Sequence, residues 1–268
     1  MPDSRPIAVF DSGIGSLSVI QALKQGLPNE SIIYLADRAH YPYGRKTKEQ
    51  LKSIIVQTLK FLEKFDPKSI IVASITPSML VLREARLHTT VPVFGVYPTL
   101  DGAVALSKTK HIALMATEGI IQSNELDEYV KPYIMTTKIV MVNASPMIDL
   151  IESGQFLEDA NIKETITRVM HSVRSDPKID VVILGSTHLP LIKDRIANLF
   201  PKMQFVNPAL DTVRQVKTYQ QQDMTSQGKG SMQILVSKNR EQFEKIIRAL
   251  GIKEKVEDIV LDFKVDIF

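Results

Sequence analysis

Ile70–Ser78 reads IIVASITPS, and Val182–Pro190 reads VILGSTHLP. Each segment is an apolar run, then a small residue, then a serine with a threonine close behind it. The two segments lie roughly 110 residues apart, which is too far for a solenoid repeat. The pair therefore predicts two related α/β halves that face each other.

Short β-branched runs alternate with longer amphipathic stretches along the rest of the chain, which indicates parallel βαβ units. The runs are apolar on both faces, as buried parallel strands are. Thr47–Gln50 reads TKEQ, a capping box, and predicts a helix start. Gln220–Gly230 is polar and is expected to be an exposed loop. The expected strands are Pro6–Phe10, Ser31–Leu35, Ser69–Ala73, Val91–Val96, His111–Met115, Lys138–Val142, Asp180–Leu184, Met203–Val206, Met232–Val236 and Asp258–Leu261.

The composition is that of a globular protein with one large domain or two small ones, since 44% of its 268 residues are apolar. The net charge is +3 without any block of like charges, which indicates a solvated basic surface, so no nucleic-acid partner is expected. No signal-peptide or membrane-spanning pattern is visible, so a cytoplasmic location and no membrane partner are expected. Cysteine is absent, which excludes thiol catalysis and zinc–thiolate sites. The histidines lack metal-ligand spacing, and no metal is expected.

Three polar clusters follow expected strands: Asp11–Gly13, Ser74–Thr76 and Ser186–His188. Ligands of open α/β sheets bind beyond the carboxyl ends of the strands. The three clusters are therefore the candidate ligand-binding residues.

The segment Phe10–Gly15 (FDSGIG) has two interpretations. Its two glycines and the later Asp37 partly match a dinucleotide-binding fingerprint, but Ser18 stands where the third glycine should be. Alternatively, Asp11 and Ser12 form a plain turn and helix cap, which the composition favours.

Gly185–His188 (GSTH) places a hydroxyl and an imidazole after a strand. A serine hydrolase would need G-x-S-x-G at the strand–helix turn, and that pattern is missing. The simpler interpretation is a helix-capping Ser or Thr beside a partly exposed His.

Eight motifs in one order and spacing resemble the glutamate racemase family, from about Ile7 to Ala209. They are DSGIGSLSV (Asp11–Val19), LADRAHYPYGRKT (Leu35–Thr47), VASITPS (Val72–Ser78), VFGVYP (Val93–Pro98), MATEGIIQS (Met115–Ser123), ASPMIDLIESG (Ala144–Gly154), VILGSTHLPLI (Val182–Ile192) and VNPA (Val206–Ala209). The resemblance implies two α/β domains, residues 1–96 with 208–268 and residues 97–207, with a glutamate site in the cleft between them. It also implies cofactor-independent interconversion of L- and D-glutamate for peptidoglycan, a small-molecule substrate, and a homodimer.

Racemisation removes an α-proton from one face and returns a proton to the other, which two groups on opposite sides of Cα can do. The family uses two thiols, whose ordinary pKa of about 8.5 suits both roles. By the resemblance, Ser74 and Ser186 occupy the two thiol positions. Asp11 would assist at Ser74, His188 would assist at Ser186, and Glu152 would orient His188.

The resemblance also implies the residues that contact the substrate through backbone, hydroxyl and carboxylate groups. These positions are Asp11, Ser12, Tyr43, Gly44, Ile75, Thr76, Thr117 and Thr187.

The chain departs from the family pattern at several other positions. Ile75 stands for an Asn and Ile120 for a Thr, each removing hydrogen bonds worth roughly 1 kcal/mol or more. Tyr97 stands for a Glu, Asn207 for an Asp, and Ser145 for a frequent Cys. Racemase activity is therefore expected to be very low or absent. Two readings stay open: an active racemase whose cysteines were replaced, or a naturally drifted homologue that binds a small acid or a protein partner.

Overall fold

The computed structural model describes residues 3–220, 230–261 and 263. The chain forms two compact units, Met1–Val96 with Ala209–Phe268, and Tyr97–Pro208. Each unit is built on a sheet whose strand pairs are all parallel. The predicted fold class, two α/β units with parallel sheets, is confirmed.

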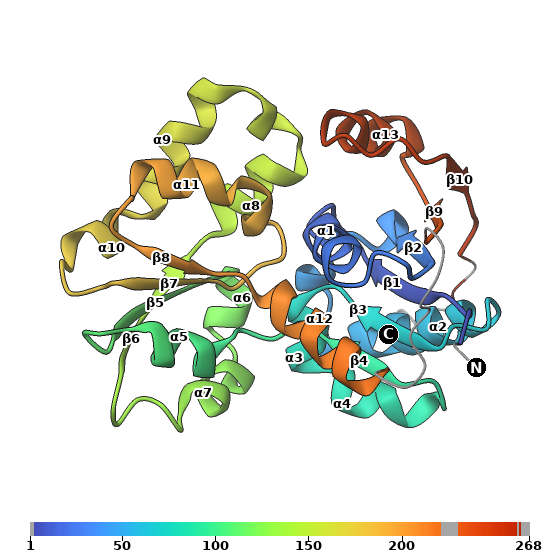
Figure 1. The fold of residues 1–268 in the computed structure, drawn as a ribbon, viewed down its shortest axis with the longest axis horizontal. Coiled ribbons are helices and arrows are strands. Elements are labelled where there is room, and N and C mark those ends of the chain that lie inside the picture. Colours follow the sequence, from blue (N-terminus) through green and yellow to red (C-terminus); the bar gives the residue numbers. More distant parts are fainter. Residues whose placement is uncertain (1–2, 221–229, 262, 264–268) are drawn as a thin grey trace. The chain divides into compact units, whose positions relative to one another are not determined.

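The first unit holds a six-stranded sheet in the order β10-β9-β2-β1-β3-β4. Strand β1 is buried along its whole length and pairs with β2 and β3, with Val9 opposite Tyr34 and Ile71. The last part of the chain, orange to red in Figure 1, adds β9 beside β2. The strands are β1 (Ile7–Asp11), β2 (Ile32–Ala36), β3 (Ser69–Val72), β4 (Val93–Gly95), β9 (Met232–Val236) and β10 (Val256–Asp258).

Helices connect the strands of the first unit. Helix α2 begins at the predicted capping box: the Gln50 backbone N–H donates to Thr47 Oγ1 and the Thr47 N–H donates to Gln50 Oε1, both at 3.2 Å. The helices are α1 (Ser16–Gly26), η1 (Arg38–His40), η2 (Tyr43–Arg45), α2 (Lys48–Glu63), α3 (Ile75–Leu80), α4 (Leu82–Ala85), η3 (Arg86–His88), α12 (Pro208–Tyr219) and α13 (Arg240–Ala249).

The second unit holds a four-stranded sheet in the order β6-β5-β7-β8. Its two central strands consist almost entirely of buried residues. The strands are β5 (His111–Ala116), β6 (Lys138–Asn143), β7 (Val181–Leu184) and β8 (Gln204–Val206). The helices are α5 (Leu100–Leu106), α6 (Glu118–Ile121), α7 (Asn124–Val130), α8 (Ser145–Glu152), η4 (Gln155–Leu157), α9 (Asp159–Val169), α10 (His171–Ser175), η5 (Leu189–Ile192) and α11 (Lys193–Leu199).

Two local predictions are corrected. The last strand runs over Val256–Asp258, because it pairs with β9, which ends at Val236. The predicted run continued to Leu261, but Val260 is 87% exposed. Gln220 is buried, not exposed, and its Nε2 donates to Ser69 Oγ at 2.9 Å. Residues 221–229 of the predicted loop lie outside the described residues, and Gly230 at its end is half-buried.

Over residues 3–220, 230–261 and 263, the structure contains no helix that is both long and apolar enough to span a membrane.

Candidate functional site

Asp11 and Ser74 lie at the same edge of the first sheet, because Asp11 ends β1, and Ser74 follows β3, the neighbouring parallel strand. Asp11 is buried, and its Oδ1 accepts the Ser12 N–H at 2.7 Å. The helix-cap interpretation of Asp11 and Ser12 is wrong, since Gly15 occupies the N-cap of α1 without a side-chain bond. The Ser74 hydroxyl does not cap α3 either.

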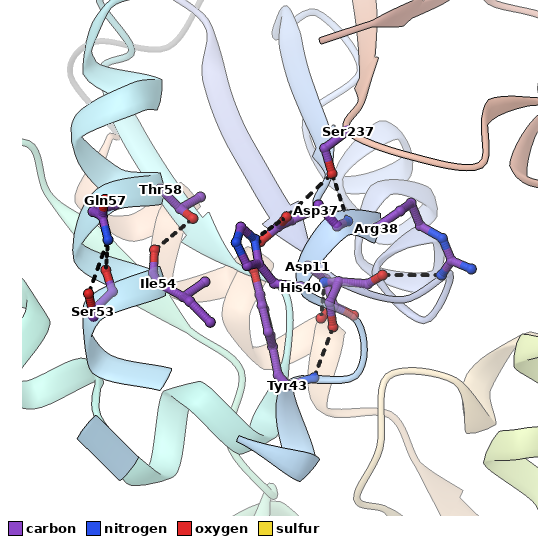
Figure 2. A network of polar contacts seen from close by, with 12 residues as sticks. Asp11, Asp37, Arg38, His40, Tyr43, Ser53, Ile54, Gln57, Thr58 and Ser237 are labelled. Carbon is purple, nitrogen blue, oxygen red and sulfur yellow. Dashed lines mark hydrogen bonds and ion pairs between the residues drawn. The ribbon is translucent and has the colours of Figure 1, made fainter. Parts of the chain in front are cut away.

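The segment after β2 carries a polar network centred on Asp37 (Figure 2). Asp37 is completely buried. Its carboxylate accepts the Tyr43 hydroxyl at 2.8 Å and lies 2.7 and 2.9 Å from His40 Nδ1. The Ser237 hydroxyl donates to it at 3.4 Å. A carboxylate engaged in this way inside the unit argues against the ribose-binding role that a dinucleotide fingerprint would give it.

Tyr43 and Ser12 join this network to the Asp11 cluster. The Tyr43 backbone N–H donates to Ser12 Oγ at 3.4 Å, and Arg38 Nη1 donates to Ser12 O at 3.1 Å. Burial raises the pKa of the Tyr43 phenol well above its ordinary value, and the Asp37 and Asp11 carboxylates raise it further. Gly44, the next residue, is exposed. The Tyr43 phenol therefore acts as a buried neutral donor, while the backbone beside it lies at the surface.

Ile75 and Thr76 begin α3, directly after Ser74. The Ile75 side chain is only 4% exposed, and Thr76 is half-buried. An apolar side chain packed into the unit offers no hydrogen bond to a ligand at this position.

In the second unit, Ser186 follows β7 after Gly185. A Cβ at Gly185 would lie 2.3 Å from the backbone oxygen of Met115, so glycine permits the close approach to β5 that places Ser186. Ser186 and Thr187 are buried.

His188 links Ser186 to Glu152 of α8. Its Nδ1 lies 3.4 Å from Ser186 Oγ, and its Nε2 lies 2.8 Å from Glu152 Oε2. His188 is 8% exposed, so the expectation of a partly exposed histidine is wrong. Ser186 does not cap a helix, because His188 occupies the N-cap of η5. The chain Ser186–His188–Glu152 can move a proton to or from the serine oxygen.

The remaining candidates of the second unit lie around α6. Thr117 precedes α6 and makes no side-chain cap bond. Ile120 is 2% exposed, so it packs into the unit as Ile75 does. Ser145 Oγ accepts the Glu118 backbone N–H at 3.1 Å, so this hydroxyl stabilises the start of α6.

The polar network formed by Asp37, Arg38, His40 and Ser237 is not among the predicted site features. The spacing of Asp37, His40 and Tyr43, three residues apart along one segment, was an available signal. Ser237 lies 200 positions from Asp37, and the sequence offers no signal for that contact.

Among the described residues, no group of three or more His, Asp or Glu side chains is placed to hold a metal ion.

Comparison with known proteins points to one family. The profile of the Asp/Glu/hydantoin racemases matches residues 7–216. The glutamate racemase of Limosilactobacillus reuteri is 34% identical over 216 residues, covering 80% of each chain.

Solved structures agree with the sequence comparison. The glutamate racemase isoform RacE1 of Bacillus anthracis matches with a TM-score of 0.86 at 26% identity, covering 97% of this chain and 98% of that one. The glutamate racemase of Francisella tularensis in complex with D-glutamate matches with a TM-score of 0.81 at 27% identity, covering 97% and 99%. The chain belongs to the Asp/Glu/hydantoin racemase family and, within it, to the glutamate racemases.

Proposed function

We propose that this chain is a glutamate racemase homologue that binds a small amino acid-like acid and has lost efficient two-base racemisation. The observation that carries the proposal is the pair of serines, Ser74 and Ser186, at the two positions that the family pattern gives to thiols. A ligand of the size of glutamate is supported by a relative of the same fold, whose structure contains D-glutamate.

The loss of rate follows from acidity. A serine hydroxyl is a far weaker acid than a thiol and is a poor base or nucleophile without an activating partner. Each unit of pKa mismatch corresponds to about 1.36 kcal/mol. A mismatch of several units at two positions slows proton transfer by many orders of magnitude.

The partners of the two serines are unequal. Ser186 has His188 at 3.4 Å, and His188 has Glu152 at 2.8 Å. By the family pattern Ser74 would rely on Asp11, whose Oδ1 accepts the Ser12 N–H. Any residual chemistry is therefore one-sided proton exchange at Ser186, without inversion.

Affinity for glutamate itself is expected to be weak. The buried side chains of Ile75 and Ile120 replace polar groups of the family pattern. Each missing hydrogen bond weakens binding by roughly 1 kcal/mol. Asp11, Ser12, Tyr43 and Gly44 support residual binding of a zwitterion or a carboxylate.

Several further properties belong to the same proposal. They are a cytoplasmic location, an origin in D-glutamate supply for peptidoglycan, action without a cofactor, and assembly as a homodimer.

The test combines calorimetric titration of L- and D-glutamate with α-proton exchange in D₂O. We expect no racemisation, at most slow exchange without inversion, and a Kd above about 1 mM, equivalent to about −4 kcal/mol. The Limosilactobacillus reuteri relative serves as the control that must exchange both enantiomers. Submillimolar binding would show that the two isoleucines weaken glutamate binding little, and full racemisation would refute the proposal.

The codons of the natural gene at positions 74 and 186 show whether the serines arose by evolutionary drift or replaced cysteines. Serine codons at positions 74 and 186 support the proposal. Cysteine codons there would favour the alternative, a racemase whose thiols were replaced.

A further inference from the structure

The loop after β2 is anchored by a buried carboxylate, Asp37. Asp37 directly follows β2, its N–H donates to Asp11 O at 2.8 Å, and its side chain is fully buried. Burying a carboxylate is unfavourable unless donors surround it. Every donor that reaches Asp37 is therefore held in place by that requirement.

Donors come to Asp37 from two separate parts of the chain. Tyr43 and His40 lie on the loop itself. The Tyr43 hydroxyl donates to Asp37 at 2.8 Å, a shorter bond than that of the Ser237 hydroxyl. Ser237 comes from the segment after β9; its N–H donates to Ala36 O at 3.1 Å, and its Oγ accepts the Ala39 N–H at 2.9 Å. The end of β9 thus closes the network from the opposite side to Tyr43 (Figure 2).

Tyr43 is held at both ends. Its hydroxyl is fixed on Asp37, while its backbone N–H reaches Ser12 Oγ at 3.4 Å. The short η2 turn begins at Tyr43, and its second residue, Gly44, lies at the surface. The position of this exposed backbone therefore depends on the bond between the Tyr43 hydroxyl and Asp37.

We propose that Asp37 is a positioning residue for ligand binding: through the Tyr43 hydroxyl it holds the Tyr43–Gly44 backbone against Ser12, ready to receive the carboxylate of a ligand. The identity of Tyr43 and Gly44 as ligand contacts rests on the function proposed above. The bond from Tyr43 to Asp37 is itself independent of any ligand.

Tyr43→Phe is the decisive variant, because it removes the phenolic donor and leaves the ring. Tyr133→Phe is its matched control in the second unit, where the Tyr133 hydroxyl donates to Asp101 at 2.7 Å. Asp37→Asn is the conservative variant. Its amide oxygen can still accept the Tyr43 hydroxyl, and its NH₂ group can donate to His40 Nδ1 in the tautomer whose Nδ1 carries no proton. Asp37→Ala removes both interactions.

Amide hydrogen exchange, followed by NMR, reads out the loop directly. The amides to follow are those of Tyr43, Arg45 and Lys46, which donate to Ser12, Pro42 and Tyr43. We expect Tyr43→Phe and Asp37→Ala to speed their exchange about tenfold or more, because a hydrogen bond to a charged group is lost. Strand β1 should change less than the loop, Tyr133→Phe should leave the loop unchanged, and Asp37→Asn should retain most of the protection.

Unchanged loop exchange in Tyr43→Phe would overturn the proposal. An equal acceleration across β1, β2 and the loop would also overturn it, since Asp37 would then be a general stabilising residue. Titration with L- and D-glutamate tests ligand binding: Tyr43→Phe should raise the Kd for any glutamate that binds about tenfold. If the unaltered protein does not bind glutamate, the proposed ligand fails, while the exchange result still decides the role of Asp37.

Discussion

Lys68 and Glu30 form an ion pair whose side chains are 3% and 2% exposed. Lys68 Nζ also donates to the Asp3 backbone oxygen at 2.8 Å. Such a pair gives little net stability compared with apolar residues, but the loss of one partner leaves a buried charge unpaired. The pair therefore constrains substitution at the start of β3 more strongly than any surface charge does.

Lys68→Met should lower the free energy of unfolding by about 3–5 kcal/mol, because Glu30 loses its cation. Chemical denaturation measures the change. Lys52→Met is the control, since the Lys52–Glu84 pair is 44% and 52% exposed and should matter little. If the double variant Glu30→Leu/Lys68→Met were as unstable as Lys68→Met, the unpaired charge would not be the cause.

Single residues differed in how far the sequence could predict them. Ser74, Ser186, His188 and Glu152 were assigned through family resemblance. Glu152 lies 2.8 Å from His188, and its orienting role stays a prediction. The polar network around Asp37 was not predicted in full, because one of its donors, Ser237, lies 200 positions away. Contacts at such separation have no periodicity that a sequence pattern can reveal.

Elements were predicted well wherever burial and periodicity agree. Each expected strand overlaps an observed one, and the capping box at Thr47 begins α2 as predicted. The last strand shows the limit: the apolar run after Asp258 lies largely outside the sheet, while Val256, set among charged residues, is fully buried. Pairing with β9 decides which three residues form the strand, and this pairing is a tertiary effect.

Asp180 ties the start of β7 to the loop before β5. It accepts the Ser107 hydroxyl at 2.6 Å and the N–H groups of Lys108 and Thr109 at 2.8 and 3.2 Å. Burial alone would raise the pKa of Asp180, but these hydrogen bonds outweigh it and hold the pKa below its ordinary value of 3.8. A depressed folded-state pKa contributes stability above the unfolded pKa and loses it as the pH falls through the folded value.

Asp180→Asn should therefore lower the Tm at pH 7. The difference in Tm between this variant and the unaltered protein should shrink below about pH 4. Thermal unfolding at pH 7, 4, 3 and 2 measures it. Ser107→Ala removes one of the three donors and should reproduce part of the loss at neutral pH. A Tm difference that stays constant down to pH 2 would mean that the charge of Asp180 does not stabilise these hydrogen bonds.

At the scale of the whole molecule, the chain returns to its first unit after building its second. Strand β9 pairs with β2, with Ile32 opposite Met232. The two candidate serines therefore belong to different units, Ser74 to the first and Ser186 to the second. A reaction that needs a base at each of these two positions should not be restored by repair of one serine alone.

Ser74→Cys/Ser186→Cys should not restore full racemisation, and Ile75→Asn and Ile120→Thr should also be needed. Thiols supply the acid and the base, but proton transfer also needs Cα held between them at a reactive distance. The polar contacts that would hold it are missing where Ile75 and Ile120 pack into their units, at 4% and 2% exposure. The assay is α-proton exchange in D₂O together with the optical rotation of L-glutamate.

The two readouts separate the causes of failure in the double-cysteine protein. Exchange without inversion would mean that one base works alone, and we expect this at position 186, where His188 contacts Glu152 at 2.8 Å. Exchange that appears only when the two isoleucines are also replaced would locate the defect in substrate positioning. If the double-cysteine protein instead turns over glutamate at about 1–10³ s⁻¹, the loss of polar contacts has no catalytic weight, and replacement of the thiols alone inactivated the enzyme.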